Sequence, residues 1–378
     1  MKICIITGPF MCLPPHSTGA IEKRWAKKGE YMGRQGDEVI FVSKRPILNE
    51  QDTDVLNRIY VKGYDRTKSW WGDLFLDLIY SYRALKAAPL SDIVVLNSIW
   101  SPILYPLFKR KLKHALYNVA RFPKKQLGLY KAVDCLSCVS VAVYNAAIKQ
   151  TPSLKNKICV INNPIDTELF TNYTIKECSS NPTIVYSGRI HEEKGLDILV
   201  RAINILVEQN YKVKLTLIGP VDVASGGSGE KYKRYLESIA ESYKINWVKP
   251  LFSAKDLAKE ISKGDIFCYP SVASKGETFG VAPLEAMGLG LPTIVSALDC
   301  FKDFVEDGKT GLVFNHMDKE ASQMLALLIL KIIESKELYQ FLSKNGSEKA
   351  RCFSVEKIVD AYREKFIEII NEKTVSKK

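Results

Sequence analysis

Two glutamates eight positions apart are the first residues whose type and spacing suggest chemistry. Glu277 and Glu285 lie in the stretch 276–288, which follows a β-rich run. Pro283 fits the first turn of a helix, where its missing N–H costs nothing, so Glu277 is expected on the loop and Glu285 in the helix. Carboxylates placed this way accept hydrogen bonds from separate hydroxyl groups of one polyol ligand. The free N–H groups of 278–280 lie where an anionic or hydroxylated ligand can approach.

A simpler interpretation makes Glu277 a helix cap and Glu285 a solvated residue, and spacing alone favours it. The neighbours of Glu285 argue against it, because they leave the helix almost free of other charge: Leu284, Ala286 and Met287. A carboxylate buried among such residues needs a polar partner. We therefore prefer the ligand-binding interpretation.

A second group of residues, Tyr186–Leu196, is expected to connect a strand to a helix. Arg189 and Lys194 lie in this crossover, just after Gly188. Two cations together with the amides of a helix N-terminus form a diphosphate site. Taken singly, basic residues in a loop are more often solvated.

A third turn, Pro14–Glu22, follows the first expected strand and contains His16 and Gly19. Gly19 lets the backbone approach a phosphate closely. The turn is not a G-x-G-x-x-G fingerprint, and the chain has no G-x-x-x-x-G-K-[ST] loop. Nicotinamide-dependent and ATPase functions are therefore disfavoured.

Buried parallel strands are expected to position these residues. The first half has short β-rich runs, several of them continuously apolar, as buried parallel strands are: 3–7, 38–42, 59–63, 93–97, 115–120, 136–139 and 158–161. A polar, turn-rich stretch, 167–182, predicts a linker. The alternation of strands and helices then restarts, with strands at 183–188, 214–219, 246–248, 266–270, 293–297 and 311–314.

Two consecutive α/β patterns predict two doubly wound parallel sheets, with ligands at the carboxyl ends of the strands. We predict two Rossmann-like domains, 1–170 and 171–354, that face one another across a cleft holding the active site. An amphipathic C-terminal helix at about 355–372 is of a kind that can return to the first domain.

The motifs resemble those of the family 4 retaining glycosyltransferases of the GT-B fold. The E-x7-E spacing of that family is seen as Glu277 and Glu285, and its S-G-R-x-x-x-x-K-G segment as Ser187–Gly195. The resemblance spans both predicted domains. It implies two Rossmann-like domains, a nucleotide-sugar donor held mainly by the second, and an acceptor held by the first.

The resemblance implies a role for each matching residue of the second half. Arg189 and Lys194 would hold the donor diphosphate and stabilise the departing charge, which is the work of a metal in other transferases. Glu285 would bind the ribose hydroxyls and Glu277 those of the transferred sugar, and the catalytic set is Arg189, Lys194 and Glu277. The base would rest near Trp247–Leu251. Further donor contacts are implied for Gly19, Gly188, Gly219, Val248, Leu251, Thr278, Phe279 and Gly280.

The chain departs from the family at one position of the first half. The family usually carries a histidine at the end of a first-domain strand, facing the donor sugar, where this chain has Asn118. An amide can still hydrogen-bond a hydroxyl. Contacts to the acceptor or the sugar are therefore expected from Asn118, His16, Arg121 and Lys124.

The implied reaction is transfer of a hexosyl or pentosyl group from a nucleotide-sugar, by default a UDP-sugar, to a hydroxyl of a glycan or glycolipid. The anomeric configuration would be retained by front-face attack, with the charge of the leaving group stabilised electrostatically and no metal or other cofactor required. A glycogen-phosphorylase-like enzyme shares the two-domain architecture, but this chain shows no sequence context for a pyridoxal-bound lysine. The remaining alternative is a GT-B module without activity that binds a polyanion or a membrane surface through its basic half.

The nine cysteines fall mostly singly inside apolar runs, as buried free thiols do, which fits a reducing, cytoplasmic compartment. Cys135 and Cys138 have the C-x2-C spacing of a zinc or redox site, but no second pair or nearby histidine completes it. Two thiols in a strand are the preferred interpretation. We expect no signal peptide and no transmembrane helix.

The net charge of +12 comes from the first half, because residues 1–160 hold 25 Lys and Arg against 12 Asp and Glu. A basic half suggests an anionic partner, such as a phosphorylated acceptor, a membrane surface or a nucleic acid, and a merely soluble basic surface fits equally well. The nucleotide-sugar motifs make nucleic acid the least expected of these. The aromatic run 69–80 fits peripheral contact with a membrane, although such a run is more often core packing.

Overall fold

The chain folds into two compact units in the computed structural model, which describes residues 1–14, 19–46, 56–171 and 176–375. One unit is Met1–Pro164 with Val355–Lys378, and the other is Ile165–Ser354. The boundary precedes the stretch 167–182 that the sequence suggested as a linker. Ile165 already belongs to the second unit because its N–H donates to the carbonyl of Phe353 at 2.9 Å.

The first unit contains a seven-stranded sheet in the order β3-β2-β1-β4-β5-β6-β7, with neighbouring strands parallel. Its strands are β1 (Lys2–Ile6), β2 (Glu38–Lys44), β3 (Asn57–Val61), β4 (Ser91–Leu96), β5 (Leu112–Val119), β6 (Cys135–Cys138) and β7 (Ile158–Val160). Its helices are α1 (Ala20–Arg34), α2 (Trp70–Ala87), α3 (Ser101–Leu104), α4 (Val141–Gln150) and α11 (Val355–Val375). After their polar first residues, the central strands β1 and β4 are continuously apolar, as strands with both faces buried are.

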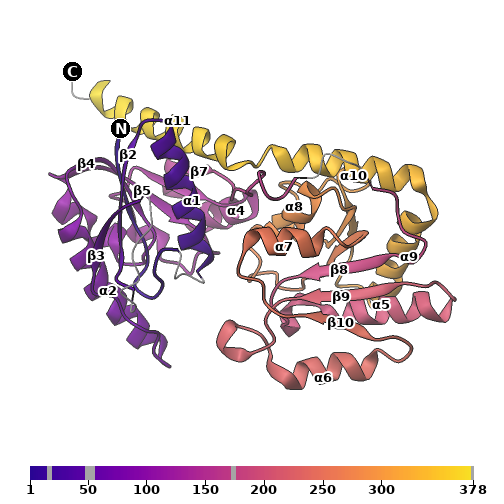
Figure 1. Cartoon of the computed structure of the whole chain (residues 1–378). Helices are drawn as coiled ribbons and strands as arrows, with labels where there is room; N and C mark the ends of the chain where they lie inside the picture. The colour runs from indigo at the N-terminus through magenta and orange to yellow at the C-terminus, as the bar shows by residue number, and fades with distance from the viewer. Residues whose placement is uncertain (15–18, 47–55, 172–175, 376–378) are drawn as a thin grey trace. The chain divides into compact units, whose positions relative to one another are not determined.

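The second unit contains a six-stranded parallel sheet in the order β10-β9-β8-β11-β12-β13. Its strands are β8 (Thr183–Ser187), β9 (Lys214–Ile218), β10 (Ile245–Val248), β11 (Ile266–Tyr269), β12 (Thr293–Ser296) and β13 (Leu312–Phe314). Its helices are α5 (Leu196–Glu208), α6 (Gly229–Ile239), α7 (Ala254–Ile261), α8 (Val281–Gly288), α9 (Ala321–Glu334) and α10 (Lys336–Arg351). Figure 1 shows α7 and α8 on one side of this sheet and α5 on the other.

The two sheets follow the same plan. In each, the first strand is central, the next two strands extend the sheet to one side, and the later strands extend it to the other. The prediction of two Rossmann-like, doubly wound parallel sheets is therefore confirmed. The order reverses between β1 and β4 and between β8 and β11, and the carboxyl ends of those strands are where such sheets bind ligands. The cleft expected between the units stays a prediction.

The C-terminal helix α11 is part of the first unit's core, where it packs against α1. Trp25 of α1 and Tyr362 of α11 have ring centroids 5.1 Å apart. The ammonium of Lys28 lies 3.3 Å from the centroid of the Trp25 ring and 4.5 Å from that of Tyr362. Burial lowers the pKa of Lys28 well below its ordinary value. An ionisable side chain thus fills a place between two aromatic rings.

In the part of the chain that the structure describes, no helix combines the length and apolar character needed to cross a membrane.

Candidate functional site

The crossover from β8 to α5 positions Arg189 and Lys194. Lys194 ends a short 3-10 turn, and Gly195 follows in the left-handed conformation with φ of 61°. A Cβ atom at this position would lie 2.2 Å from the carbonyl oxygen of Pro270. Gly195 therefore lets the start of α5 approach the end of β11, which brings Lys194 to the second loop of the site.

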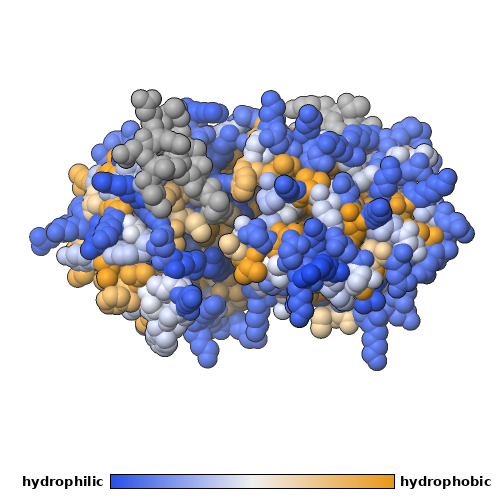
Figure 2. All heavy atoms as spheres, turned by 60° about the horizontal axis from the view of Figure 1, so that its bottom comes forward, coloured by the Kyte–Doolittle hydropathy of each residue, from blue (hydrophilic) through white to orange (hydrophobic). Residues whose placement is uncertain are grey.

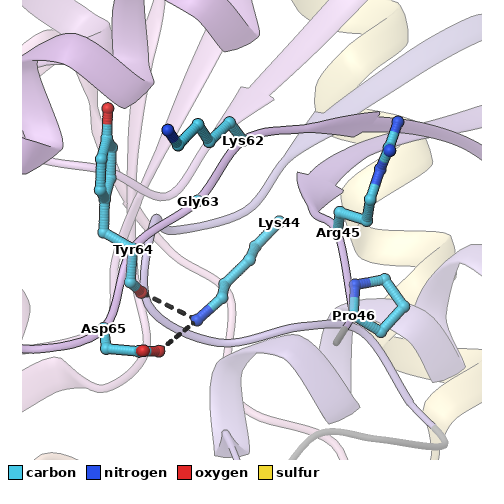
Figure 3. A pocket seen from close by; sticks show the side chains of 7 residues that line it. All are labelled: Lys44, Arg45, Pro46, Lys62, Gly63, Tyr64 and Asp65. Atoms are coloured by element: carbon cyan, nitrogen blue, oxygen red, sulfur yellow. Dashed lines mark hydrogen bonds and ion pairs between the residues drawn. The ribbon is translucent and has the colours of Figure 1, made fainter. Parts of the chain in front are cut away.

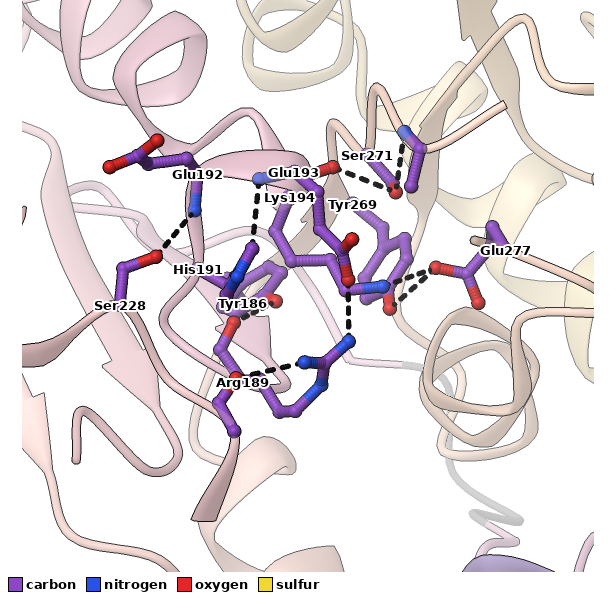
Figure 4. Close-up of polar contacts among 12 residues, drawn as sticks. Tyr186, Arg189, His191, Glu192, Glu193, Lys194, Ser228, Tyr269, Ser271 and Glu277 are labelled. Atoms are coloured by element: carbon purple, nitrogen blue, oxygen red, sulfur yellow. Dashed lines mark hydrogen bonds and ion pairs between the residues drawn. The ribbon is translucent and has the colours of Figure 1, made fainter. Parts of the chain in front are cut away.

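Lys194 forms an ion pair with Glu277 from the loop after β11. Its Nζ lies 2.6 Å from Oε2 of Glu277, and the two side chains are only 7% and 12% exposed. The hydroxyl of Tyr269 donates to the same oxygen at 3.1 Å (Figure 4). Burial, and then the negative charge of Glu277, hold the pKa of Tyr269 well above its ordinary value, so the phenol keeps its proton as a donor. The carboxylate is thus fixed by two donors.

Arg189 is held at the edge of the same site. Its guanidinium donates to the carbonyl of Gly226 at 2.8 Å and pairs with the carboxylate of Glu193 (Figure 4). Its own carbonyl accepts a hydrogen bond from the buried hydroxyl of Tyr186 at 2.9 Å. The Arg189 side chain is 44% exposed, so its remaining N–H groups can meet a ligand from solvent.

The backbone of Glu193 ties the two loops of the site together. Its carbonyl accepts from the N–H of Val272 at 2.9 Å and from the hydroxyl of Ser271 at 3.3 Å. Ser271, two residues after the end of β11, is fully buried. The position of Arg189 and Lys194 relative to Glu277 is therefore set by main-chain contacts as well as by the ion pair.

The loop that carries Glu277 leads into α8, which begins at Val281. Gly280 caps this helix in the left-handed conformation, with φ of 85°. The ring of Phe279 is buried against two other aromatic rings, so only the main chain of Phe279 is placed to meet a ligand. Thr278 and Glu285 are partly buried, in the loop and in α8 respectively.

The remaining predicted donor residues of the second unit follow neighbouring strands. Gly188 comes directly after β8 and Gly219 directly after β9, and Gly219 donates its N–H to the carbonyl of Val248 at the end of β10 at 3.1 Å. A Cβ atom on Gly219 would lie 1.9 Å from the carbonyl oxygen of Gly188. Leu251 lies in the loop after β10. The predicted residues of the second unit thus gather at the carboxyl end of its sheet.

In the first unit, Gly19 caps α1, as the third turn suggested. A Cβ atom here would lie 2.1 Å from Oε2 of Glu22, which sequence reasoning passed over although it ends the same turn. Glu22 is 7% exposed, and its burial raises its pKa, an effect that the positive charge of Arg121 opposes. His16 lies outside the described residues.

Asn118 lies one residue before the end of β5 and is 7% exposed. Its Nδ2 donates to Oδ1 of Asn97 at 2.8 Å, and Asn97 donates to the carbonyl of Ile6 at 3.0 Å. Its Oδ1 is buried and meets no hydrogen-bond partner among the described residues. Arg121 and Lys124 are exposed in the loop after β5. The carboxyl ends of the central strands therefore present an unsatisfied amide oxygen near exposed cations.

A cavity of about 490 Å³ lies at the carboxyl ends of β2 and β3 (Figure 3). Lys44, Arg45 and Lys62 line it together with Tyr64 and Asp65. The ammonium of Lys44 is held by the carbonyl of Tyr64 at 2.9 Å and by the carboxylate of Asp65 at 2.8 Å. Sequence reasoning missed this cavity. The sequence did offer one indication of a basic cavity: Lys44 ends β2 and Lys62 directly follows β3.

The cysteines of the C-x2-C pair both lie in β6 as buried free thiols. The sulfur of Cys135 is 3.3 Å from that of Cys159. No group of three or more His, Cys, Asp and Glu side chains is placed to hold a metal ion within the described parts of the chain.

The sequence of this chain is similar to those of known glycosyltransferases. Residues 175–349 match the family model described as glycosyl transferases group 1. A D-inositol 3-phosphate glycosyltransferase of Nocardioides sp. is 26% identical over 200 residues, which cover 49% of this chain and 42% of that protein. The sulfoquinovosyl transferase SQD2 of Arabidopsis thaliana is 25% identical over 283 residues, 71% of this chain and 51% of that protein. The chain is thus similar to glycosyl transferases group 1 over most of its second unit.

This chain spans about half the length of those two relatives. An uncharacterized glycosyltransferase of Haemophilus influenzae is 24% identical and matches over 94% of this chain and 98% of its own length. Among solved structures, the sucrose-phosphate synthase of Thermosynechococcus elongatus has a TM-score of 0.76 at 20% identity, and Anabaena HepE in complex with UDP and glucose a TM-score of 0.73 at 17% identity. The alignments cover 97% of this chain and 100% of each of those chains. The likeness to solved structures confirms the predicted GT-B fold.

Proposed function

We propose that this chain is a group 1 glycosyltransferase that moves a hexosyl or pentosyl group from a nucleotide-sugar to a hydroxyl acceptor, with retention of configuration and without a required metal. The observation that carries the proposal is the arrangement of Arg189, Lys194 and Glu277. These two cations and one carboxylate, from two loops, meet at the carboxyl end of the second sheet. A nucleotide-sugar offers a diphosphate to the cations and sugar hydroxyls to the carboxylate.

The reaction forms a bond between the acceptor oxygen and the anomeric carbon while the bond from that carbon to the diphosphate breaks. Arg189 and Lys194 stabilise the negative charge that develops on the diphosphate, and the amides before α8 add to this field. The acceptor proton passes to the leaving diphosphate. The acceptor attacks from the side the diphosphate leaves, so the configuration is retained.

A UDP-sugar is the proposed donor. Support comes from the solved structures of HepE, which contain UDP with glucose and UDP-glucose. We assign Glu285 to the ribose hydroxyls and Glu277 to the sugar hydroxyls, as the resemblance implies. Asn118 is the proposed contact of the first unit with the sugar, because its buried Oδ1 would gain a donor from a hydroxyl group.

The proposed acceptor is a glycan or glycolipid hydroxyl on a molecule that also carries negative charge. The cavity lined by Lys44, Arg45 and Lys62 supports the anionic part of this proposal. Arg121 and Lys124 after β5 are further candidates for acceptor contact. We also propose a reducing, cytoplasmic setting, supported by the free state of all nine cysteines.

Calorimetric titration of the purified protein with UDP-, GDP-, ADP- and dTDP-sugars, in buffer with a chelator, tests the donor site. We expect one nucleotide to bind and expect Arg189→Ala and Glu285→Ala to abolish binding. The matched control is Arg201→Ala, because Arg201 is an exposed arginine of the same unit whose contact is the hydroxyl of Tyr235. If no nucleotide binds and the protein instead binds a polyanion in a salt-sensitive way, the proposed enzyme function is wrong and the chain is a polyanion-binding module. NMR of the product's anomeric proton tests retention.

A further inference from the structure

Helix α2 of the first unit presents large aromatic side chains to solvent. Trp71 is 72% exposed and Phe75 62%, and Tyr82, further along the helix, is 47% exposed. Trp71 and Phe75 are four positions apart and Tyr82 is about three turns from Trp71, so the three lie along one face of the helix. Trp70 is 57% exposed beside them. We call this face the aromatic face of α2.

The core does not need this aromatic face. The opposite face of α2 is already buried through Tyr80 and Ala84, which are fully covered. Leu107, in the short 3-10 turn that contacts α2, is 72% exposed and extends the apolar surface. Figure 2 shows one face of the molecule, where hydrophobic residues, in orange, lie among hydrophilic ones, in blue. A group of large, strongly exposed apolar side chains on a folded protein often marks an interaction site.

Most of the exposed charges near the aromatic face are positive, although Asp65 is exposed too and Arg66 pairs with Asp73. The exposed basic residues within α2 or just before it are Arg66, Lys68, Arg83 and Lys86. Lys109 and Arg110 are exposed directly after the 3-10 turn that contacts α2. The acidic residues of α2 are engaged within the protein, since Asp73 accepts from Thr67 and Arg66, and Asp77 is 4% exposed and accepts from Ser81 and from the N–H of Ile99. Positive charge beside exposed tryptophan complements the surface of an anionic lipid layer, whose headgroups are negative and whose acyl chains are apolar.

We propose that the aromatic face of α2 docks on an anionic lipid membrane. Tryptophan and phenylalanine would enter the interface between headgroups and acyl chains, while the lysine and arginine side chains meet the lipid phosphates. A second copy of this chain is a poorer occupant, because a symmetric contact would place the same positive residues against one another. The inference rests on the first unit alone and stands whether or not the transfer reaction is as proposed.

Sedimentation of the full chain with phosphatidylcholine vesicles, with and without phosphatidylglycerol, tests the proposal. We expect binding to the vesicles that contain phosphatidylglycerol, a shift of tryptophan emission to shorter wavelength, and weaker binding at high salt. The double variant Trp71→Ser/Phe75→Ser should bind at least about tenfold more weakly, because two large apolar side chains no longer leave water. Lys86→Gln/Lys109→Gln should also bind more weakly.

The matched control is Phe252→Ser, which removes a phenylalanine that is 76% exposed in the second unit and should bind vesicles as the unchanged protein does. Circular dichroism and nucleotide titration establish that each variant is folded. Equal vesicle binding by Trp71→Ser/Phe75→Ser and the unchanged protein would overturn the proposal, as would no binding to phosphatidylglycerol. A dimer in light scattering that the double variant loses would instead assign the face to contact between copies.

Discussion

Lys194 and Glu277 lie 83 positions apart in the chain, yet their side chains meet at 2.6 Å in a place where both are nearly covered. Each charge is neutralised by the other while no donor is bound. A donor diphosphate would therefore compete with Glu277 for Lys194, and sugar hydroxyls would in turn supply donors to Glu277. The ion pair satisfies two nearly buried charges, and under the proposed function a ligand of the expected chemistry would replace their contact.

Removing only one charge of this pair should destabilise the second unit. Lys194→Met leaves the Glu277 carboxylate buried without the cation that neutralises it, and we expect a loss of about 3 kcal/mol in the free energy of unfolding. The double variant Lys194→Met/Glu277→Gln should recover part of that loss because no unpaired charge remains. Calorimetric unfolding of the single and double variants measures the coupling. Simple additivity of the two single changes would contradict the pairing.

Arg189→Ala should lower the rate of sugar transfer about 100-fold or more, if the guanidinium stabilises the leaving diphosphate. Arg189→Lys should not restore the rate, because one ammonium cannot contact Gly226, Glu193 and a phosphate in the same planar geometry. Steady-state rates with the nucleotide-sugar identified by titration measure the effect. Arg201→Ala serves as control, and a rate for Arg189→Lys equal to that of the unchanged protein would show that the planar guanidinium of Arg189 is not needed.

The sequence predicted most of the second unit's site because its residues are close together in two short motifs. The strand and helix around each motif could be recognised from continuous apolar runs and a proline in a first turn. Tyr269 and Ser271 were missed as partners because their contacts join segments more than 70 positions apart or depend on side-chain direction. Spacing along the chain carries no information on such contacts.

In the first unit the sequence located the strands and Gly19 but not Glu22 or the cavity at Lys44. Glu22 is a charged residue in the first turn of an amphipathic helix, where a side chain is ordinarily expected to be exposed to solvent. Its carboxylate is instead buried against the backbone of Gly19. The polar composition of 167–182 suggested a linker, whereas the first segment of the first compact unit ends at Pro164, and the N–H of Ile165 bonds to Phe353 of the second unit.

Gly219→Ala should destabilise the second unit and weaken donor binding. With φ at 145° and the carbonyl oxygen of Gly188 only 1.9 Å from where a Cβ atom would lie, there is no room for a side chain, so we expect a loss of at least about 2 kcal/mol. Gly33→Ala is the matched control, because Gly33 lies in α1 and a Cβ there meets nothing within 4 Å. That change should stabilise by about 0.5–1 kcal/mol. Thermal unfolding compares them, and a neutral Gly219→Ala would show that the two strands can separate without cost.

Asn118→Ala should raise the KM for the nucleotide-sugar while leaving the affinity for the nucleotide alone unchanged, if Asn118 contacts the transferred sugar. Asn118→His, which restores the family's usual residue, tests whether the site accepts an imidazole there. Steady-state kinetics and nucleotide titration separate the two effects. An equal loss of nucleotide affinity in Asn118→Ala would assign the residue to the fold instead, through its bond to Asn97.

Lys28→Met should stabilise the first unit at neutral pH, and the gain should shrink as the pH rises. Burial holds the folded-state pKa of Lys28 well below the ordinary value of 10.5. Between the folded and unfolded pKa values the unfolded chain keeps the proton and the folded chain releases it, so the stability of the unchanged protein rises with pH through that window. Methionine has no such penalty at any pH.

We expect Lys28→Met to gain at least about 1 kcal/mol at neutral pH, since one unit of pKa shift corresponds to about that free energy. The gain should be smaller near pH 9, and denaturant unfolding of the two proteins at several pH values measures the difference. Other titrating groups contribute equally to both proteins and cancel. Attraction of the ammonium to the Trp25 and Tyr362 rings opposes the burial effect. A less stable Lys28→Met at neutral pH would show that this attraction outweighs the cost of burying the charge.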